Sequence, residues 1–360
     1  MKVSTRATLD CSIDSAWEAL HTPGVFRAVS APFTVFRTPP GGELPERFEP
    51  GVDYGVDVWA SGILPLGRQT IHLTDQVTDW TSRTVTDTGH GDSGALGLLR
   101  DWNHQMRLTA RPDGRTDFHD TLSVRAGAIT PLLWLAMKVM WSWRAMRLRQ
   151  VTRQLDPEAT RQWNQRYAGK DAMWSGRVNP SLEKVASSLS PGHAIDAGAG
   201  EGGDALWLAS QGWHVTALEA SSVGIFRGVS EQKRRGEDGA MADISWHVAD
   251  LTKPWPVDSE SADLVSLQFI HAPQQARDAI WAHALKAVAP GGRLLITGHH
   301  PEDALAGIPR PPAQMCFSDE QLRALIPSDW SAVDVQTITR TQTMGKRDVD
   351  VRDVVLVATR

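Results

Sequence analysis

Glycines crowd a short stretch near the middle of the chain, where a run of small apolar residues ends in Asp196 and is followed by Gly198, Gly200, Gly202 and Gly203. An apolar helical pattern begins directly after them. This order predicts a strand, a tight turn and a helix. Glycine allows positive φ and close approach of a ligand, and a helix N-terminus presents unpaired N–H groups and a positive dipole end. The stretch therefore predicts a loop for a nucleotide-type cofactor, with an ordinary strand-to-helix turn as the alternative.

Two cofactor classes fit these glycines. Gly198, Gly200 and Gly203 satisfy the G-x-G-x-x-G pattern of dinucleotide-dependent enzymes, which would make the protein an NAD(P)-dependent oxidoreductase. Asp196 together with Gly198, Gly200 and Gly202 resembles the first motif of class I methyltransferases that depend on S-adenosylmethionine (SAM). Neither pattern decides the cofactor, so the elements around the loop must do so.

Length and composition bound the remaining possibilities. A chain of 360 residues has room for two domains, and a net charge of −5 with signs well mixed does not suggest a nucleic-acid partner. The two cysteines, Cys11 and Cys316, lie far apart, as suits a reducing compartment. The N-terminus lacks the apolar core of a signal peptide, and the longest apolar stretch, residues 131–143, is too short to cross a membrane. We expect a soluble, cytoplasmic protein with no membrane partner, and its oligomeric state is open.

The first half reads as one strand, two short helices, a run of strands and a long helix. Residues 2–10 alternate in polarity, and short helical patterns surround Pro23. Residues 39–50, rich in proline, glycine and glutamate, predict an exposed loop. Alternating or β-branched segments then predict strands at 54–60, 69–73, 82–86, 101–110 and 116–124. A helix is expected from Pro131 to about residue 155.

This order of elements resembles the SRPBCC superfamily (START-like, polyketide cyclase-like) over most of residues 1–155. The resemblance rests on the element order and on the junction that leads from Asp120–Gly127 into Pro131–Trp134. It implies an α+β helix-grip fold, in which a curved sheet wraps the last helix and leaves an apolar cavity. It also implies binding of an apolar small molecule, and in some members cyclisation. It supplies no catalytic residues that can be carried over.

Side chains in this half have mostly structural interpretations. Tryptophan and methionine at helical spacing between residues 134 and 143 are expected to fill a core. His104 and His119 could do acid–base work in a cavity, although structural roles are favoured. Arg144, Arg147 and Arg149 are expected on a solvated helix face. We identify no catalytic constellation here.

A second domain is expected over residues 156–360, because Pro157 disfavours continuation of the long helix. Strands and helices alternate from there on, which predicts a parallel α/β sheet. The predicted strands cover residues 193–197, 213–218, 244–248, 262–267, 293–297, 331–339 and 349–359.

Two features separate the cofactor classes. Asp250 stands directly after the third of these strands, where a dinucleotide fold needs no carboxylate. The sequence Pro290-Gly-Gly292 introduces the fifth strand, and two further strands follow it. With the glycine loop, this combination resembles class I SAM-dependent methyltransferases over residues 157–360 and implies their Rossmann-like, seven-stranded fold. Trp163 with Tyr167, and the segment Trp174–Pro180, resemble the tellurite-resistance and thiopurine methyltransferase-like branch.

The resemblance implies SAM as cofactor and a set of binding residues. In chain order these are Trp174, Arg177, Asp196, Gly198, Gly200, Gly202, Glu219, Asp250, Leu251 and Gln268. Asp196 and the glycines would cradle the methionine part. Glu219, at the end of the second strand, would hold the ribose, and Asp250 with Leu251 would frame the adenine. Trp174 and Arg177 would close over the cofactor, with Arg177 pairing its carboxylate. Gln268 lies just past the fourth strand, and Ala199 stands where this branch more often has cysteine.

Transfer from SAM depends chiefly on aligning a nucleophile, so a base is needed only for a weakly acidic acceptor. His271, past the fourth strand, is the candidate base, and a structural residue at a strand end is the alternative. The Asn-Pro-Pro-Tyr motif is absent at this position, which disfavours DNA methylation. His299 and His300 lack a ligand partner at suitable spacing, so no metal site is expected.

The sequence therefore predicts a SAM-dependent methyltransferase for a small, apolar metabolite, joined to a domain that binds or cyclises an apolar ligand. A protein that binds SAM or an apolar ligand without turnover remains a third possibility, beside the oxidoreductase.

Overall fold

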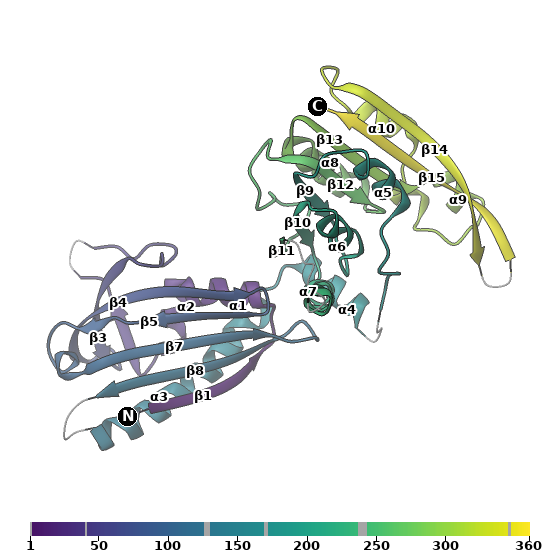
Figure 1. The fold of residues 1–360 in the computed structure, drawn as a ribbon. Coiled ribbons are helices and arrows are strands. Elements are labelled where there is room, and N and C mark those ends of the chain that lie inside the picture. Colours follow the sequence, from purple (N-terminus) through teal and green to yellow (C-terminus); the bar gives the residue numbers. More distant parts are fainter. Residues whose placement is uncertain (1, 40–41, 126–129, 169–171, 237–242, 345–346) are drawn as a thin grey trace. The chain divides into compact units, whose positions relative to one another are not determined.

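The computed structural model describes residues 2–39, 42–125, 130–168, 172–236, 243–344 and 347–360, without the side chains of residues 130–133 and 154. The chain divides into two compact units, Met1–Glu158 and Ala159–Arg360 (Figure 1). The division falls three residues after the predicted boundary at 155/156. Asp156 lies with the first unit because its carboxylate accepts hydrogen bonds from the main-chain N–H (2.9 Å) and the hydroxyl (2.6 Å) of Ser12.

An antiparallel sheet dominates the first unit. Its strands run in the spatial order β1-β8-β7-β5-β4-β3-β2, and the short β6 (His90–Gly91) pairs with β4. The strands on this path are β1 (Lys2–Leu9), β2 (Thr34–Arg37), β3 (Asp53–Ala60), β4 (Leu64–Asp79), β5 (Ser82–Asp87), β7 (Arg100–Ala110) and β8 (Thr116–Arg125). The first strand of this sheet, β1, pairs with the last in sequence, β8. Residues 126–129 of the junction used for the SRPBCC resemblance lie outside the described part of the chain.

In the part of this unit that the structure describes, three α-helices accompany the sheet. They are α1 (Ile13–His21), α2 (Pro23–Ser30) and the long α3 (Thr130–Val151). Ser12 caps α1 by accepting from the N–H of Ser15, as Ser, Thr, Asp and Asn commonly do at helix starts. On α3, Trp141 is buried against Val3, Leu122 and Val124 of β1 and β8, which agrees with the core-filling prediction for this residue.

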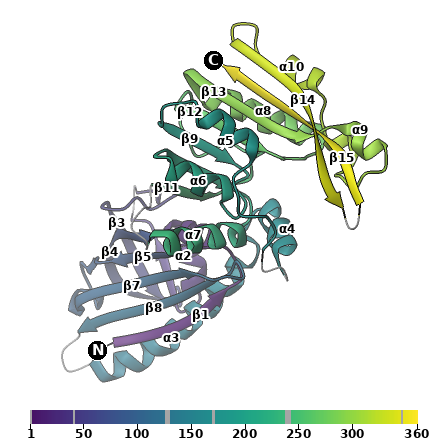
Figure 2. The same ribbon diagram turned by 45° about the vertical axis from the view of Figure 1, so that its right-hand side comes forward.

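The second unit is built on a seven-stranded sheet (Figure 2). Its strands are β9 (His193–Ala197), β10 (His214–Glu219), β11 (Ile244–Val248), β12 (Ala262–Gln268), β13 (Val288–His299), β14 (Ser331–Met344) and β15 (Arg347–Thr359). The spatial order is β11-β10-β9-β12-β13-β15-β14, and β9 to β13 are mutually parallel. Strand β15 is antiparallel to both β13 and β14. The two predicted strands after β13 are therefore present, and they form an antiparallel ribbon.

Among the described residues, seven α-helices accompany this sheet. They are α4 (Glu158–Tyr167), α5 (Pro180–Ala186), α6 (Gly203–Ser210), α7 (Ser222–Gly236), α8 (Gln274–Ala287), α9 (Pro301–Leu305) and α10 (Asp319–Leu325). Strand order reverses at β9, since β10 and β11 lie on one side of it and β12 and β13 on the other. Ligands of open α/β sheets bind at such a reversal, beyond the carboxyl ends of the strands. The glycine loop follows β9 and so lies at this point of the sheet.

In the described part of the chain, no helix is long and apolar enough to span a bilayer.

Candidate active site

The glycine loop is held against the end of β10 by main-chain hydrogen bonds. The N–H groups of Gly198 (2.7 Å) and Ala199 (3.0 Å) both donate to the carbonyl of Leu218. Gly198, Gly200 and Gly202 have φ values of +79°, +59° and +84°. Residues with a Cβ rarely adopt such values. Gly202 is the N-cap of α6, so the loop leads the chain directly into a helix N-terminus. The predicted strand, turn and helix are confirmed.

Side chains also pack closely against two of these positions. A Cβ on Gly198 would come within 2.1 Å of Ile270 Cδ1, and one on Gly202 within 2.5 Å of the Trp246 ring. Gly200 lies under Trp174, whose ring atoms would be 3.1 Å from an added Cβ. The loop is thus a surface of bare backbone bounded by side chains from distant segments.

Three carboxyl groups are buried at this loop. Asp196 ends β9, Asp204 is in the first turn of α6, and Glu219 ends β10. Glu219 accepts from the N–H groups of Gly200 (2.9 Å) and Ser221 (2.7 Å), and Asp204 accepts from the main chain and side chain of Asn179 (both 2.7 Å). Oδ2 of Asp196 is buried and has no hydrogen-bond partner among the described residues.

The pKa values of these three groups are shifted in one direction. Burial raises the pKa of Asp196 well above its ordinary value, and the neighbouring charges of Asp204 and Glu219 raise it further. Burial likewise raises the pKa values of Asp204 and Glu219, against the hydrogen bonds that each accepts. No ion pair to any of the three occurs within the described ranges of the chain. The cluster is therefore a buried acidic site without its own cation.

Trp174 and Tyr167 form one wall of the loop. The indole N–H of Trp174 donates to the Tyr167 hydroxyl (2.9 Å), and the main-chain N–H of Trp174 donates to the carboxylate of Glu201 (3.0 Å). Glu201 is held in turn by Arg227 (2.7 Å). The side chain of Arg177 is exposed, and this residue meets α6 through its main chain, whose carbonyl lies 3.0 Å from a Cβ added to Gly203.

The other predicted contacts occupy neighbouring strand ends. Asp250 closes the turn after β11, where Oδ1 accepts from the N–H (3.0 Å) and hydroxyl (2.7 Å) of Thr252. Leu251 is buried close to Gly198, 3.9 Å from an added Cβ. Gln268 accepts a hydrogen bond from Ser181 (2.9 Å) and donates one to Ser266 (3.0 Å), so its amide is engaged within the protein.

His271 is held in a way that does not suit a base. Its Nε2 accepts from the main-chain N–H of His299 (3.1 Å), and its ring stacks on that of His299 at 4.8 Å. Burial and the neighbouring His299 lower the pKa of His271 to about 4. The predicted base is therefore a neutral side chain that supports the end of β13, in agreement with the structural alternative.

His299 itself lies opposite a carboxylate. Its Nδ1 is 2.8 Å from Asp353, and Asp353 is also paired with Arg340. Burial would raise the pKa of Asp353, but its hydrogen bonds and the positive charges around it lower it, so the carboxylate is ionised. An ionised acceptor holds a proton of His299 on Nδ1, so the lone pair of the neutral ring is on Nε2. No hydrogen bond to this Nε2 occurs among the residues that the structure describes.

No group of three or more His, Cys, Asp or Glu side chains within the described part of the chain could hold a metal ion.

Comparison with known families decides between the two cofactor classes. A family described as "Methyltransferase domain" matches residues 194–292, which run from β9 through the glycine loop to β13. The chain is a SAM-dependent methyltransferase.

Two curated relatives of this methyltransferase act on small molecules. A 2-heptyl-1-hydroxyquinolin-4(1H)-one methyltransferase of Mycobacteroides abscessus is 24% identical over 165 residues, covering 45% of this chain and 70% of that protein. A thiopurine S-methyltransferase of Legionella pneumophila is 28% identical over 153 residues, covering 37% of this chain and 67% of that protein. The crystal structure of TehB from Haemophilus influenzae aligns with a TM-score of 0.42 and 14% identity, over 71% of this chain and 73% of TehB.

Sequence reasoning on the methyltransferase missed several residues at its site. Asp204 stood in the glycine stretch and could have been recognised as a second carboxylate in the first turn of a helix. Asp353 carried no local signal, because it meets His299 only through the antiparallel register of β13 and β15. Trp246 on β11 also carried no local signal, because it meets Gly202 only in the folded structure.

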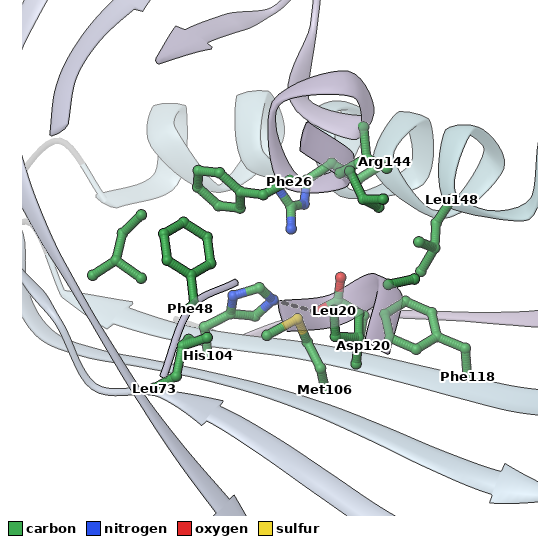
Figure 3. A pocket seen from close by; sticks show the side chains of 14 residues that line it. Leu20, Phe26, Phe48, Leu73, His104, Met106, Phe118, Asp120, Arg144 and Leu148 are labelled. Carbon is green, nitrogen blue, oxygen red and sulfur yellow. Dashed lines mark hydrogen bonds and ion pairs between the residues drawn. The ribbon is translucent and has the colours of Figure 1, made fainter. Parts of the chain in front are cut away.

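The first unit of the methyltransferase contains a separate cavity of about 40 Å³ (Figure 3). Its lining combines apolar side chains with His104, Asp120 and Arg144. Two predictions were wrong here. Arg144 is 9% exposed instead of solvated, and Phe48, expected in an exposed loop, is 1% exposed. Both side chains turn inward, which the sequence pattern did not reveal.

Proposed function

We propose that the protein transfers the methyl group of SAM to a small, apolar metabolite, and that the glycine loop with its three carboxyl groups forms the SAM site. The observation that carries this proposal is the unpartnered, buried Oδ2 of Asp196 beside a loop of bare backbone. Burying a carboxylate oxygen without a partner costs free energy unless a ligand satisfies it.

Each predicted residue has a task in this site. Asp196 would accept from the ammonium group of the methionine part, across the bare backbone of Gly198, Gly200 and Gly202. Glu219 already accepts from two main-chain N–H groups, so its remaining lone pairs would serve the ribose hydroxyls. Asp250 and Leu251 would bound the adenine. Trp174, which lies over Gly200, would cover the cofactor, and the exposed Arg177 would reach it only after moving.

SAM supplies a methyl group already activated on a sulfonium. The protein's contribution is to align the acceptor and to remove water from around it. Phe269 lies against His271 and His299 at the carboxyl ends of β12 and β13 and offers an apolar contact to an acceptor, while the buried Phe317 packs behind His271. Gln268, engaged with Ser181 and Ser266, would support this edge without touching the acceptor.

The residue suited to take a proton from an acidic acceptor is His299 instead of His271. Asp353 fixes the proton of His299 on Nδ1, so Nε2 can accept. His271 uses its Nε2 to hold the main chain of His299 and would act as a positioning residue. The relatives' substrates, an N-hydroxyquinolone and thiopurines, are weakly acidic small molecules, which supports an acceptor of this chemical kind.

For the first unit, we propose the role implied by the SRPBCC resemblance, binding of an apolar ligand. The order of its elements and the internal cavity lined by α1, α2, α3 and the sheet support this role. Cyclisation would need a catalytic set, and the proposal does not extend to it.

Isothermal titration with S-adenosylhomocysteine (SAH), NAD and NADP tests the cofactor site on the full chain. Wild type is compared with Asp196→Asn, which keeps the size of the side chain, and with Asp329→Asn, which makes the same change at an exposed position. We expect SAH binding in wild type and in Asp329→Asn, and a loss of about tenfold or more in Asp196→Asn, since a hydrogen bond to a charged group is worth about 1.5–3 kcal/mol. Equal SAH affinity in all three proteins would reject the assigned site, whereas binding of NAD or NADP alone would reject the methyltransferase function.

A further inference from the structure

Arg144 is a buried cation in the cavity of the first unit. Its Nη1 donates to the hydroxyl of Ser30 (2.7 Å), and its guanidinium lies over the rings of Trp141 (5.3 Å) and Phe26 (5.8 Å). Its Nε is buried and has no hydrogen-bond partner in the described structure. No carboxylate forms an ion pair with it within the described ranges. Buried charges are ordinarily paired, so this guanidinium lacks a counter-ion.

The two nearest carboxylates are already engaged elsewhere. Asp120 accepts from His104 Nε2 (2.6 Å) and from the indole N–H of Trp141 (3.0 Å), both at the same oxygen. Asp87 accepts from Trp102 (3.2 Å) and from the main-chain N–H of Gly89 (2.9 Å). Burial lowers the pKa of Arg144, while the charges of Asp120 and Asp87 oppose this from a distance. The chain therefore keeps a positive charge at the cavity without neutralising it by contact.

The rest of the cavity wall is largely apolar. Figure 3 shows His104 and Asp120 joined on one side, with Arg144 extending from α3 on the other and Phe26 and Phe48 beside it. Leu20, Leu73, Met106, Phe118 and Leu148 complete much of the lining. A volume of about 40 Å³ holds roughly three water molecules, so a larger occupant enters only when wall side chains move. Met106 suits such a change, because methionine has three rotatable bonds and a polarisable sulfur.

We propose that this cavity binds an apolar molecule that carries one anionic oxygen group, such as a carboxylate, with that group paired to Arg144. A guanidinium offers several N–H donors in one plane and matches a carboxylate, whereas a neutral head group would leave its charge uncompensated. The apolar part of the ligand would lie against Phe26, Phe48 and Leu20. This inference rests on the proposed ligand-binding role of the first unit and adds the chemical class of the ligand.

The test compares octanoate with 1-octanol, which share a chain and differ in head-group charge, by isothermal titration against the full-length protein. Wild type, Arg144→Met, Arg144→Lys and Arg149→Met are titrated, the last being an exposed arginine on the same helix. We expect wild type and Arg149→Met to bind octanoate about tenfold more tightly than 1-octanol. Arg144→Met should bind both equally, and Arg144→Lys should keep part of the preference because lysine retains the charge.

The outcomes separate this inference from the role on which it rests. Equal affinity of wild type for the two ligands, or an undiminished preference in Arg144→Met, would overturn the assignment of an anionic ligand and leave apolar binding intact. Binding of neither ligand to wild type would overturn both. Circular dichroism checks that the variants fold. If Arg144→Met does not fold, the wild-type comparison and Arg144→Lys decide, since neither removes the buried charge.

Discussion

Both units bury carboxylates beside the site proposed for a ligand, but in opposite electrostatic surroundings. In the first unit, Asp120 is 1% exposed and faces His104 and Trp141 as donors, with Arg144 nearby. Burial would raise the pKa of Asp120, but these neighbours lower it. In the second unit, Asp196 faces Asp204 and Glu219, and its pKa is raised.

The difference indicates what each site lacks. The first unit holds an unpaired cation at Arg144, so its missing partner is an anion. The second unit holds carboxyl groups that repel one another, so its missing partner is a cation, and the ammonium and sulfonium groups of SAM have that charge. Groups that destabilise the ligand-free fold are expected at binding sites, where the bound ligand compensates their charge. The same substitution should therefore have opposite effects on stability in the two units.

Replacing Asp by Asn in each unit gives the largest contrast. Asp120→Asn should destabilise the first unit by about 3 kcal/mol, because it leaves His104 without its buried carboxylate and removes a negative charge that acts on Arg144 from a distance. Asp196→Asn should stabilise the second unit by about 1 kcal/mol, because it removes a buried repulsion. Hydrogen exchange read on peptides from β8 and β9 reports each unit separately. Destabilisation of both units by similar amounts would contradict the contrast.

Within the second unit, Glu219 and Asp196 should respond differently to loss of their negative charge. Glu219 accepts from two main-chain N–H groups, so Glu219→Gln would turn an amide NH₂ toward one of those donors. We expect a loss of about 2 kcal/mol in stability together with weaker SAH binding. Asp196→Asn should weaken SAH binding while raising stability. Thermal unfolding and SAH titration of both variants measure this divergence, and parallel behaviour of the two would show that the carboxylates are equivalent.

Two glycines with the same φ, one of them in the glycine loop, differ in the space available for a side chain. Gly198 and Gly291 both have φ +79°, but a Cβ on Gly198 would lie 2.1 Å from Ile270 while nothing lies within 4 Å of Gly291. Both alanine variants should lose about 1 kcal/mol to the left-handed conformation. Gly198→Ala should lose about 1–2 kcal/mol more and should bind SAH less well. Urea unfolding gives the difference. If the two losses are equal, Ile270 moves aside freely and does not bound the loop.

Features of the fold and the site that depend on short segments were predictable from the sequence, and features that depend on distant residues were not. The glycine loop, the alternation of strands and helices and the final ribbon were predictable, because each depends on spacing within a short segment. The sequence offered His271 as the base and His299 only as a possible metal ligand, since the partner of His299, Asp353, is contributed by β15 and faces it only in the folded register. Arg144 was misplaced for a similar reason. Arg149 on the same helix is exposed, and only the packing of α2 against α3 shows that Arg144 faces inward.

The smallest expected effect is the pH dependence of the stability gained by Asp196→Asn. A carboxyl group with a raised pKa binds its proton more tightly in the folded state. Its favourable contribution is complete below the unfolded value of about 3.9 and is lost as pH rises through the folded pKa. His271, with a pKa of about 4, opposes this trend in the same unit, because a lowered histidine pKa makes the folded state lose stability on acidification.

His271 is present in both wild type and Asp196→Asn, so its contribution cancels in the difference between their stabilities. The stabilisation by Asp196→Asn should therefore be largest at pH 7 and should shrink at pH 5, measured by hydrogen exchange on β9 peptides. A gain that is constant with pH would mean that Asp196 is protonated throughout this range, and its proposed pairing with the ammonium group of SAM would then have to be abandoned.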